Sequence, residues 1–427
     1  LEEAAPPLSI EDILAAALED AGAVRGTGGR PWWRSPGAVA AGATLVVLVA
    51  IGGLTLFLRS LTGSGDSAAP GPRPALGVAV PIGGEPRSLA AVDGVLYVSV
   101  DDALVGFDPV TGSVTGRLDA IGPLSFIAAH DGDLWVGGDN MLWHVDPDRM
   151  EIVGSVLGLG GPGVAAHGSI WTGVFTDHTE DDTTDYPAGR PEGAAVARVD
   201  PATDEIVAVI SLEPSCPPGA GEPGEVGSLA ASTDAVWAST SCGGEGDYVT
   251  IERIDPAADR VTRVVTLQLD PGAQAFDPRL LVVDDQIWGY GSIYIWSEEL
   301  GDLLEGRVYR ITEADEPEFL AAIGQFPVGA VHAEGSVWVT DCFDATVTRL
   351  DPATGSVVGS PMPIGTPAPA EFDWFQPEGF TCPSSITAVG STLWIIGSVD
   401  GTLIPVYPDP SAAPGPTVTL PVPTAPP

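Results

Sequence analysis

The sequence predicts an all-β fold, a seven-bladed β-propeller of four-stranded blades, and three observations support this prediction. A phrase of small apolar residues, a turn and one aromatic residue recurs at intervals of about 40 to 65 residues, a spacing typical of propeller repeats. Asp-Pro turns follow the aromatic residue in most repeats. The 54 Gly and 41 Pro residues also suit a turn-rich chain. The recurring aromatic residues are Tyr97, Trp135, Trp171, Trp237, Trp288, Trp338 and Trp394.

Residues 1–36 are expected to be a cytoplasmic tail that contains one short amphipathic helix. Ser9 can cap this helix, with Asp12 three residues later as an acidic variant of the capping box. Apolar residues then follow at helical spacing and form a single stripe. The segment is too short for a domain. Two interpretations stay open: the helix docks on a partner, or the tail has no role of its own.

Residues 37–58 carry no charge, and a helix of this length spans about 30 Å of hydrocarbon. Arg25, Arg30 and Arg34 precede the segment, so the positive-inside rule places the N-terminus in the cytoplasm. We therefore predict a transmembrane helix, followed at residues 59–74 by a linker rich in Gly, Ser and Pro. A cleaved signal peptide is the alternative, disfavoured by the long segment that precedes the apolar run.

Residues 75–410 are expected to form the blades. In each repeat, strand A carries the small apolar residues, strand B carries the aromatic residue, and strand C ends at a turn that leads into strand D. Asp108 and Asp351 each open such a turn and are followed by Pro. The Asp carboxylate accepts backbone N–H bonds and Pro presets φ, which favours a type I turn. The aromatic side chain is expected to pack between neighbouring sheets.

The segment 75–82 has the character of a strand D, yet it precedes the first strand A. We predict that it completes the seventh blade beside strands from the C-terminal end, because closure across the chain ends removes exposed sheet edges. Residues 417–420 lie within a Pro-rich tail at 411–427 and are a competing strand D.

The segments Gly335–Val339 (Gly-Ser-Val-Trp-Val) and Asp351–Gly355 (Asp-Pro-Ala-Thr-Gly) resemble the repeats of YVTN-type and streptogramin-lyase-like seven-bladed propellers. The resemblance covers about residues 75–410 and is specific for the fold. A streptogramin lyase would imply a metal-assisted reaction that uses His and Glu on the open face of the ring. That set is not recognisable in this sequence. His332, with Glu334 two residues later, is the weak catalytic candidate, and a channel histidine without a catalytic task is the favoured interpretation.

The long insertions fall in the B-to-C and D-to-A connections, which share one face of a propeller, whereas the A-to-B and C-to-D turns are short. Long loops on one face of a rigid scaffold usually serve binding. Because strand D starts on the short-turn side, the linker is expected to enter there, which leaves the decorated face pointing away from the membrane. The expected insertions are residues 175–193, 213–226, 289–306 and 365–383.

The four cysteines are predicted to lie on the same decorated face. Four cysteines allow three pairings, and their positions favour Cys216–Cys242 and Cys342–Cys382. Disulfides agree with a propeller outside the cytoplasm. A metal site is the alternative, but no His lies near these cysteines and no Cys-x-x-Cys pair is present.

Aromatic residues in the insertions are the candidate binding residues. Rings at a surface beside acids can bind a sugar, a cationic ligand or a protein. The alternative is that these rings fold inward and give each loop a small core of its own. The candidate rings are Phe372, Trp374 and Phe375 in one loop, Tyr290, Tyr294 and Trp296 in another, and Tyr186 in a third.

Two further sets of charged residues are candidates. Arg87 and Arg279 follow Pro at matching points of two inner strands, where they either attract an anion into the central channel or pair with acids. An acidic loop is a weak candidate for Ca²⁺ or Mg²⁺, although it lacks the EF-hand spacing and a solvated loop is favoured. We otherwise expect no cofactor. The acidic loop contains Asp177, Glu180, Asp181, Asp182 and Asp185.

The charge balance restricts the partners. The chain has 17 Lys and Arg residues against 58 Asp and Glu, a net charge of -41. This charge disfavours nucleic acids and anionic lipid headgroups, because both are polyanions.

Together these features predict a single-pass protein of a bacterial cell membrane, with a cytoplasmic N-terminus and an extracytoplasmic propeller. The expected role is binding or scaffolding, with a protein or small-molecule ligand on the decorated face. The first alternative is a propeller enzyme at the channel mouth, either a metal-dependent lyase or a hydrolase. The second is an envelope sensor that signals through the cytoplasmic helix.

Overall fold

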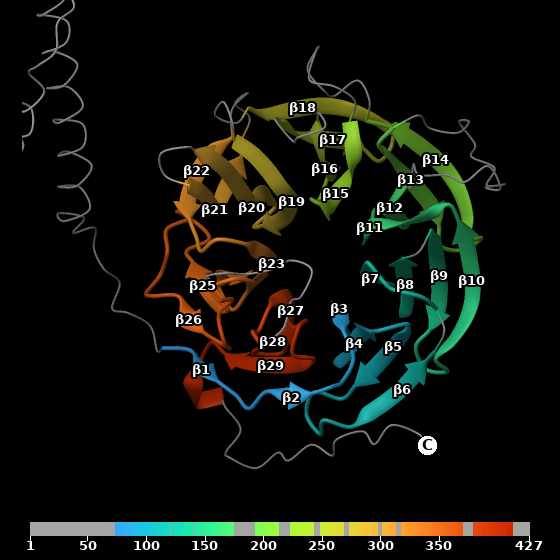
Figure 1. Ribbon diagram of the computed structural model, residues 1–427. Helices are drawn as coiled ribbons and strands as arrows, with labels where there is room; N and C mark the ends of the chain where they lie inside the picture. Colours follow the sequence, from blue (N-terminus) through green and yellow to red (C-terminus); the bar gives the residue numbers. More distant parts are fainter. Residues whose placement is uncertain are drawn as a thin grey trace, which may run out of the picture. The chain divides into compact units, whose positions relative to one another are not determined.

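Figure 1 shows a computed structural model of the chain. The chain divides into two units, residues 1–69 and 70–427, and all described residues belong to the second. The structure describes residues 73–119, 121–138, 140–174, 193–212, 223–242, 248–268, 273–297, 301–312, 317–369 and 379–412. The predicted cytoplasmic helix, the transmembrane segment at 37–58, most of the linker and most of the tail therefore lie outside the described residues. Across the ranges just given, no helix is both long enough and apolar enough to span a bilayer.

Seven antiparallel sheets form the blades, which confirms the predicted seven-bladed propeller. Blade 1 contains β3 (Pro86–Val92), β4 (Val95–Val100), β5 (Ala103–Phe107) and β6 (Val114–Leu118). Blade 2 contains β7 (Phe126–His130), β8 (Asp133–Gly138), β9 (Met141–Asp146) and β10 (Glu151–Leu157). Blade 3 contains β11 (Leu159–Ala166), β12 (Ser169–Val174), β13 (Ala195–Asp200) and β14 (Glu205–Ser211). Blade 4 contains β15 (Pro223–Ala231), β16 (Val236–Cys242), β17 (Tyr248–Asp255) and β18 (Arg260–Gln268).

The remaining blades repeat the same order of strands. Blade 5 contains β19 (Ala273–Val283), β20 (Gln286–Ser297), β21 (Gly301–Ile311) and β22 (Glu318–Ala322). Blade 6 contains β23 (Pro327–Ala333), β24 (Ser336–Asp341), β25 (Thr346–Leu350) and β26 (Met362–Pro363). Blade 7 contains β27 (Pro383–Val389), β28 (Thr392–Gly397) and β29 (Thr402–Tyr407), with β1 (Ala75–Leu76) and β2 (Val80–Pro81) beside β29. A short 3₁₀ helix, Pro410–Ala412, follows β29.

The N-terminal segment closes the ring, as the sequence predicts. Ala75 pairs with Tyr407 and Val80 pairs with Leu403, so β1 and β2 supply the outer strand of blade 7. Between them, the Gly77 N–H donates to the carbonyl of Pro405 at 2.8 Å. The competing strand at residues 417–420 lies outside the described residues. Blade 7 therefore contains both ends of the propeller, and blades 1 and 7 are neighbours (Figure 1).

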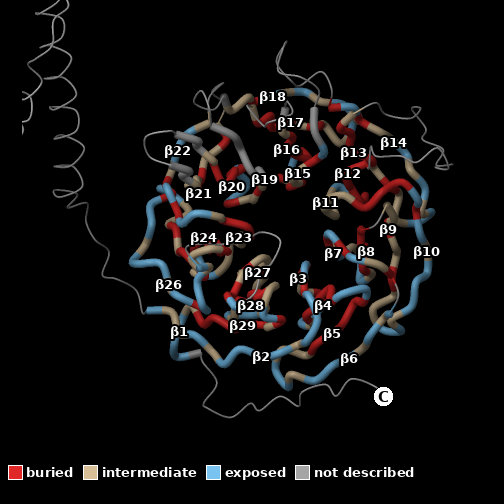
Figure 2. Tube along the Cα trace, in the orientation of Figure 1, coloured by how far each residue is buried: buried red, intermediate tan, exposed pale blue. Residues whose placement is uncertain are grey.

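The strand-B aromatic residues fill the spaces between blades. Trp135, Trp171, Trp288 and Trp338 are among the largest fully buried side chains. Trp171 of blade 3, for example, belongs to one apolar cluster with residues of blade 4. Burial of such a side chain contributes about 2 to 3 kcal/mol. In Figure 2, buried residues concentrate in the middle of the blades and exposed residues on the outermost strands.

One face of the ring, the short-turn face, contains the A-to-B and C-to-D turns. Many A-to-B turns need left-handed backbone, which Asp93 and Gly94 supply in blade 1 with φ of 49° and 82°. In the C-to-D turns, Asp108 Oδ1 accepts from the Val110 N–H at 2.8 Å, and Asp351 Oδ1 accepts from the Ala353 N–H at 2.9 Å. The predicted role of these aspartates is confirmed. The opposite face is the decorated face, from here on called the loop face, and it contains the B-to-C and D-to-A connections.

The sequence predicts a loop insertion at residues 289–306 of blade 5, and this prediction is wrong. Residues 289–306 are mostly strand, because β20 and β21 continue as a hairpin in which Ser297 pairs with Gly301. All four residues from 293 to 296 (Ile-Tyr-Ile-Trp) are β-branched or aromatic, a composition that favours an extended strand over a loop. The extra length in blade 5 therefore lengthens the sheet.

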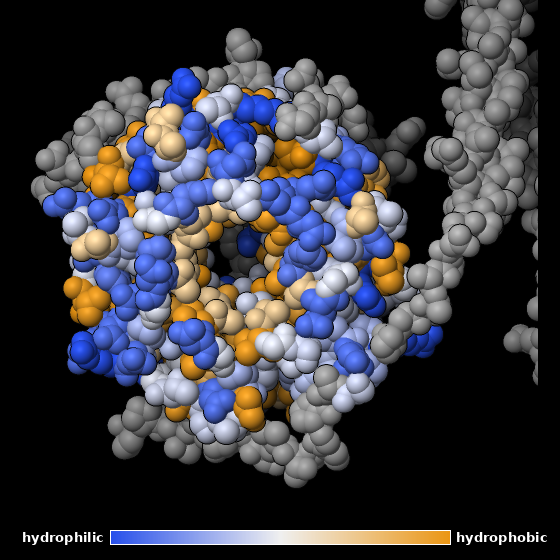
Figure 3. All heavy atoms as spheres, turned by 180° about the vertical axis from the view of Figure 1, so that it is seen from behind, coloured by the Kyte–Doolittle hydropathy of each residue, from blue (hydrophilic) through white to orange (hydrophobic). Residues whose placement is uncertain are grey.

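An opening lies at the centre of the ring in Figure 3, bordered by pale and hydrophobic residues, while hydrophilic residues dominate the surrounding face. The first strand of each blade lies nearest to this opening (Figure 1). The fold thus offers three places for a ligand: the central opening, the loop face and the spaces between blades.

Candidate functional site

Long connections are concentrated on the loop face, which makes this face the primary candidate site. The chain leaves β12 at Val174 and re-enters β13 at Ala195, and it leaves β26 at Pro363 and re-enters β27 at Pro383. The A-to-B turn of every blade is short in comparison; in blade 6, for example, only residues 334 and 335 join β23 to β24. Extra chain length is thus placed on one side of a rigid ring.

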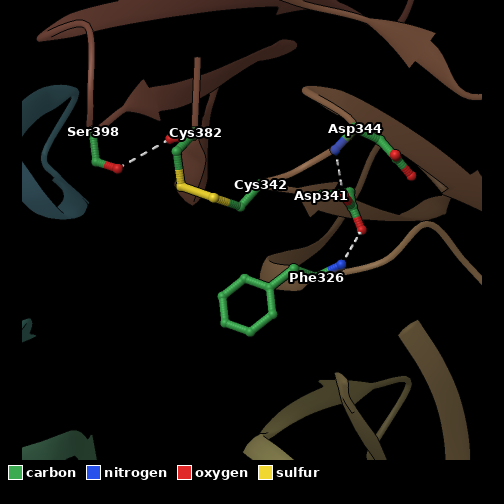
Figure 4. The surroundings of a disulfide bond; sticks show 6 residues. All are labelled: Phe326, Asp341, Cys342, Asp344, Cys382 and Ser398. Carbon is green, nitrogen blue, oxygen red and sulfur yellow. Dashed lines mark hydrogen bonds between the residues drawn. A yellow bond between two sulfur atoms is a disulfide. The ribbon is translucent and has the colours of Figure 1, made fainter. Parts of the chain in front are cut away.

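A disulfide fastens two of these connections together (Figure 4). Cys342 lies in the turn between β24 and β25 of blade 6, and Cys382 lies directly before β27 of blade 7. The predicted Cys342–Cys382 pairing is confirmed. The other predicted pair, Cys216–Cys242, cannot be followed, since Cys216 and the side chain of Cys242 lie outside the described residues.

A buried carboxylate adjoins the disulfide. Asp341 Oδ2 accepts from the Phe326 N–H at 2.7 Å, and Oδ1 accepts from the Asp344 N–H at 2.8 Å (Figure 4). Burial raises the pKa of Asp341 to about 6, although these two backbone N–H groups favour the charged form. This carboxylate therefore ties the chain entering β23 to the turn that carries Cys342.

A small apolar cluster lies on the loop face around the disulfide. Cys342, Val328 and Phe380 are buried there, and the rings of Phe326 and Phe343 stack with centroids 5.1 Å apart. The described part of the blade 6–7 connection thus has a core of its own, as the inward-folding alternative expects. The candidates Phe372, Trp374 and Phe375 lie in the part of this connection outside the described residues.

The blade 5 candidates do not form an exposed aromatic loop. Tyr290 is 9 % exposed and packs in an apolar cluster with Trp288 and Val308, so the expectation of a surface ring is wrong for Tyr290. Its position inside β20 explains the burial. Tyr294 is partly buried on the same strand. The Trp296 side chain and Tyr186 lie outside the described residues.

The two arginine candidates have different surroundings. Arg87 on β3 is exposed and lies 3.4 Å from Glu85, so its pairing with an acid is the simpler interpretation. Arg279 on β19 is partly buried and faces Tyr290 across the sheet. Arg279 is also among the residues that line the space between blades 4 and 5.

The catalytic candidates lie at the short-turn face. His332 is near the end of β23, with Nδ1 3.9 Å from Asp284 Oδ1 of the preceding blade. Glu334 is exposed in the following turn and has a left-handed φ of 52°. In the described ranges, no three His, Cys, Asp or Glu side chains gather as a metal site. The acidic loop with Asp177, Glu180, Asp181, Asp182 and Asp185 lies outside those ranges.

A repeated inter-blade contact was not predicted from the sequence. We call it the latch: the strand-B aromatic residue, the cation opposite it on strand C, and the C-to-D turn of the next blade. In blade 3, the Arg198 guanidinium lies 5.6 Å from the centre of the Trp171 ring, and its NH1 group donates to Asp259 of blade 4 at 2.9 Å. Arg310 over Trp288 and Arg349 over Trp338 repeat the cation–π contact.

His144 takes the place of arginine in the blade 2 latch. Its ring stacks on Trp135 with centroids 4.3 Å apart, and its two nitrogens lie 3.0 Å from Asp133 and 2.9 Å from Asp204 of blade 3. The sequence contains a signal for the latch, because a cation stands two residues before the turn aspartate in blades 2, 3, 4 and 6. These cations pair with the strand-B aromatic residue and so belong to the scaffold.

Comparisons with known proteins show the fold alone. No protein-family model matches the sequence, and no curated protein is similar to it in sequence. Among solved structures, hydrazine synthase of Kuenenia stuttgartiensis is similar with a TM-score of 0.57 and 12% identity, over 76% of this chain and 95% of that chain. The Cps50 (Swd1) β-propeller domain of Myceliophteria thermophila is similar with a TM-score of 0.51 and 10% identity, over 77% of this chain and 99% of that chain. Raptor of Chaetomium thermophilum is similar with a TM-score of 0.52 and 12% identity, over 79% of this chain and 29% of that chain.

Proposed function

We propose that this protein is a binding or scaffold module of a bacterial cell membrane and that it engages a partner through the loop face of its propeller. The observation that supports the proposal most directly is the asymmetry of the ring. Turns on one face are short and held by their own aspartates, whereas the other face carries the long connections and a disulfide between two of them. Rigidly held loops lose little conformational entropy when they bind.

The extracytoplasmic placement is part of the proposal. A disulfide at Cys342–Cys382 fits an oxidising compartment, and the uncharged segment at residues 37–58 fits a membrane anchor. Ala75 enters the ring beside Tyr407, at the short-turn end of β29. An anchor ahead of it would leave the loop face accessible.

Site-specific photo-crosslinking in cells tests which face binds. A crosslinking residue at Asp102 or Pro367 would report on the loop face, and one at Val110, which is 81% exposed, would report on the short-turn face. We expect adducts from the two loop-face positions and none from Val110. Equal adducts from all three positions, or adducts from Val110 alone, would overturn the proposal.

A double variant tests the aromatic candidates. Trp374→Ala with Phe375→Ala should remove the loop-face adducts without lowering the thermal midpoint of unfolding. Phe319→Ala is a matched control, because this ring is 53% exposed on the outer strand β22 and away from the loop connections. Loss of adducts in the control as well would show that the effect is not specific to the loop face.

A further inference from the structure

The inter-blade space between blades 4 and 5 contains a pocket. Its empty volume, open solvent included, is about 450 Å³. β17 and β18 supply one wall, while β19, β20, β21 and the chain before β22 supply the other. Most of the wall side chains are aliphatic, although Arg279, Tyr290, Ser292 and Tyr309 also line the pocket. The aliphatic ones are Val249, Ile251, Leu267, Leu280, Ile293 and Ile311.

One position in the wall of this pocket is a glycine. Gly289 directly follows Trp288 on β20, at the strand position where the other blades have larger side chains. A Cβ atom built on Gly289 would have no heavy atom closer than 3.8 Å, the nearest being Cδ1 of Ile251. The side chains at this position in the other blades are Val98, Val136, Thr172, Ala238, Val339 and Ile395.

Neither backbone geometry nor crowding requires glycine at this position. The φ of Gly289 is outside the left-handed region, so any residue can adopt its conformation. At Gly137 and Gly163, by contrast, a Cβ atom would lie 2.0 and 2.2 Å from the Phe126 ring, so a neighbour already occupies the space. Glycine inside a strand weakens the strand and often marks a close approach by a ligand or another backbone.

The residue opposite Gly289 does not fill the gap. Tyr309 pairs with Gly289 across β20 and β21, and an aromatic ring in this position often covers a strand glycine. Here the Tyr309 ring packs edge-on against Phe319, with centroids 5.7 Å apart, and none of its atoms is among the three nearest to the Gly289 Cβ position. Tyr309 therefore borders the pocket and leaves it open.

We propose that this pocket binds a small apolar molecule. The aliphatic side chains offer such a molecule dispersion contacts, and cavities lined mainly by such side chains take up benzene-like molecules. The site is distinct from the loop face and does not depend on the function proposed for that face. It lies within the apolar cluster shared by blades 4 and 5.

Binding of toluene and fluorobenzene to the full-length chain tests the inference. Saturation-transfer NMR and the thermal midpoint of unfolding are measured for the wild type, Gly289→Val and Gly289→Ala. The wild type should show saturation transfer and a higher midpoint with probe. Gly289→Val should bind the probe about ten-fold more weakly or worse and keep an equal or higher midpoint without probe.

Val339→Ala is the matched control, since it changes the same strand position in blade 6 and lies outside the pocket. It should lower the midpoint and leave probe binding unchanged. If Gly289→Val fails to fold, Gly289→Ala decides, because a Cβ atom alone fits at 3.8 Å. Absence of probe binding by the wild type up to the solubility limit, or unchanged binding by a folded Gly289 variant, would overturn the proposal.

Discussion

At the scale of single residues, His144 shows how the blades are joined. It occupies the strand-C position that Arg198 and Arg349 take in blades 3 and 6, opposite the aromatic residue of strand B. Each ring nitrogen faces one carboxylate, Asp133 within the blade and Asp204 in the next. His144 therefore connects blade 2 to blade 3.

Substitutions at His144 should separate the roles of charge and packing. His144→Ala should lower the free energy of unfolding by about 2 kcal/mol, because the stacked contact is lost and two carboxylates lose their shared donor. His144→Arg should retain most of the stability, as this side chain serves the latch elsewhere. Urea denaturation of both variants checks the prediction. Equal losses in both variants would contradict a latch.

Asp341 makes stability depend on pH. Its pKa is about 6 in the folded protein against an ordinary value of 3.8, so between these values the folded state holds a proton that the unfolded state has released. Its contribution to stability is therefore largest below about pH 4 and is lost as the pH rises to 6, by at most about 3 kcal/mol. Asp341→Asn should remove this dependence.

The free energy of unfolding is measured at pH 4.5 and 7 for the wild type and for Asp341→Asn. The change with pH is compared between the two proteins, because other acids titrate in both. Asp102→Asn is the control, since Asp102 is exposed and should leave the pH dependence as in the wild type. A parallel pH dependence of the wild type and Asp341→Asn would refute the assignment.

At the scale of elements, ring closure depends on two very short strands. β1 and β2 contribute two residues each. Two further hydrogen bonds join the Gly77 N–H to the Pro405 carbonyl at 2.8 Å and the Ile82 N–H to the Gly401 carbonyl at 2.9 Å. A chain that begins at residue 83 should leave β29 as an open edge. Hydrogen exchange of β29 amides should then be faster by at least about ten-fold than in a chain that begins at residue 75. Unchanged exchange would show that another segment, such as residues 417–420, replaces β1.

Sequence predicted the strands better than the loops, for a physical reason. The repeated aromatic residues and Asp-Pro turns are local signals. The number of blades, the turn chemistry and the segment that closes the ring could therefore be predicted from the sequence. The hairpin formed by residues 289–306 was not predicted, because the aromatic residues of this segment also suit a loop whose rings fold inward. Only packing against neighbouring strands decides between them, as the burial of Tyr290 shows.

At the scale of the whole molecule, the disulfide joins blades 6 and 7 on the loop face. Cys342 and Cys382 are 40 residues apart, so the cross-link should stabilise the fold by about 4 kcal/mol through the unfolded chain. Cys342→Ala with Cys382→Ala should lower the free energy of unfolding by a comparable amount. Guanidinium denaturation of variant and wild type measures it. If reduction of the wild type changes its stability but not that of the variant, the loss belongs to this bond.

The candidate site followed from the sequence only in outline. Loop placement and one cysteine pairing were predictable from strand order, because topology alone decides which connections share a face. The latch and the Gly289 pocket were not, since each depends on residues far apart in the chain that meet only between blades. A glycine in a strand has no sequence signal that tells a filled space from an empty one.

The net charge of -41 should make the stability of the molecule depend on salt. Added salt screens the long-range repulsion among exposed carboxylates, but it weakens short, partly buried pairs such as Arg198–Asp259 much less. The thermal midpoint should therefore rise between about 0.01 and 0.5 M NaCl, where the Debye length falls from about 30 Å to a few ångströms. Differential scanning calorimetry measures this shift. A midpoint that falls with salt would mean that short pairs such as Arg198–Asp259 outweigh the repulsion of the whole surface, and Arg198→Ala should then reduce the fall.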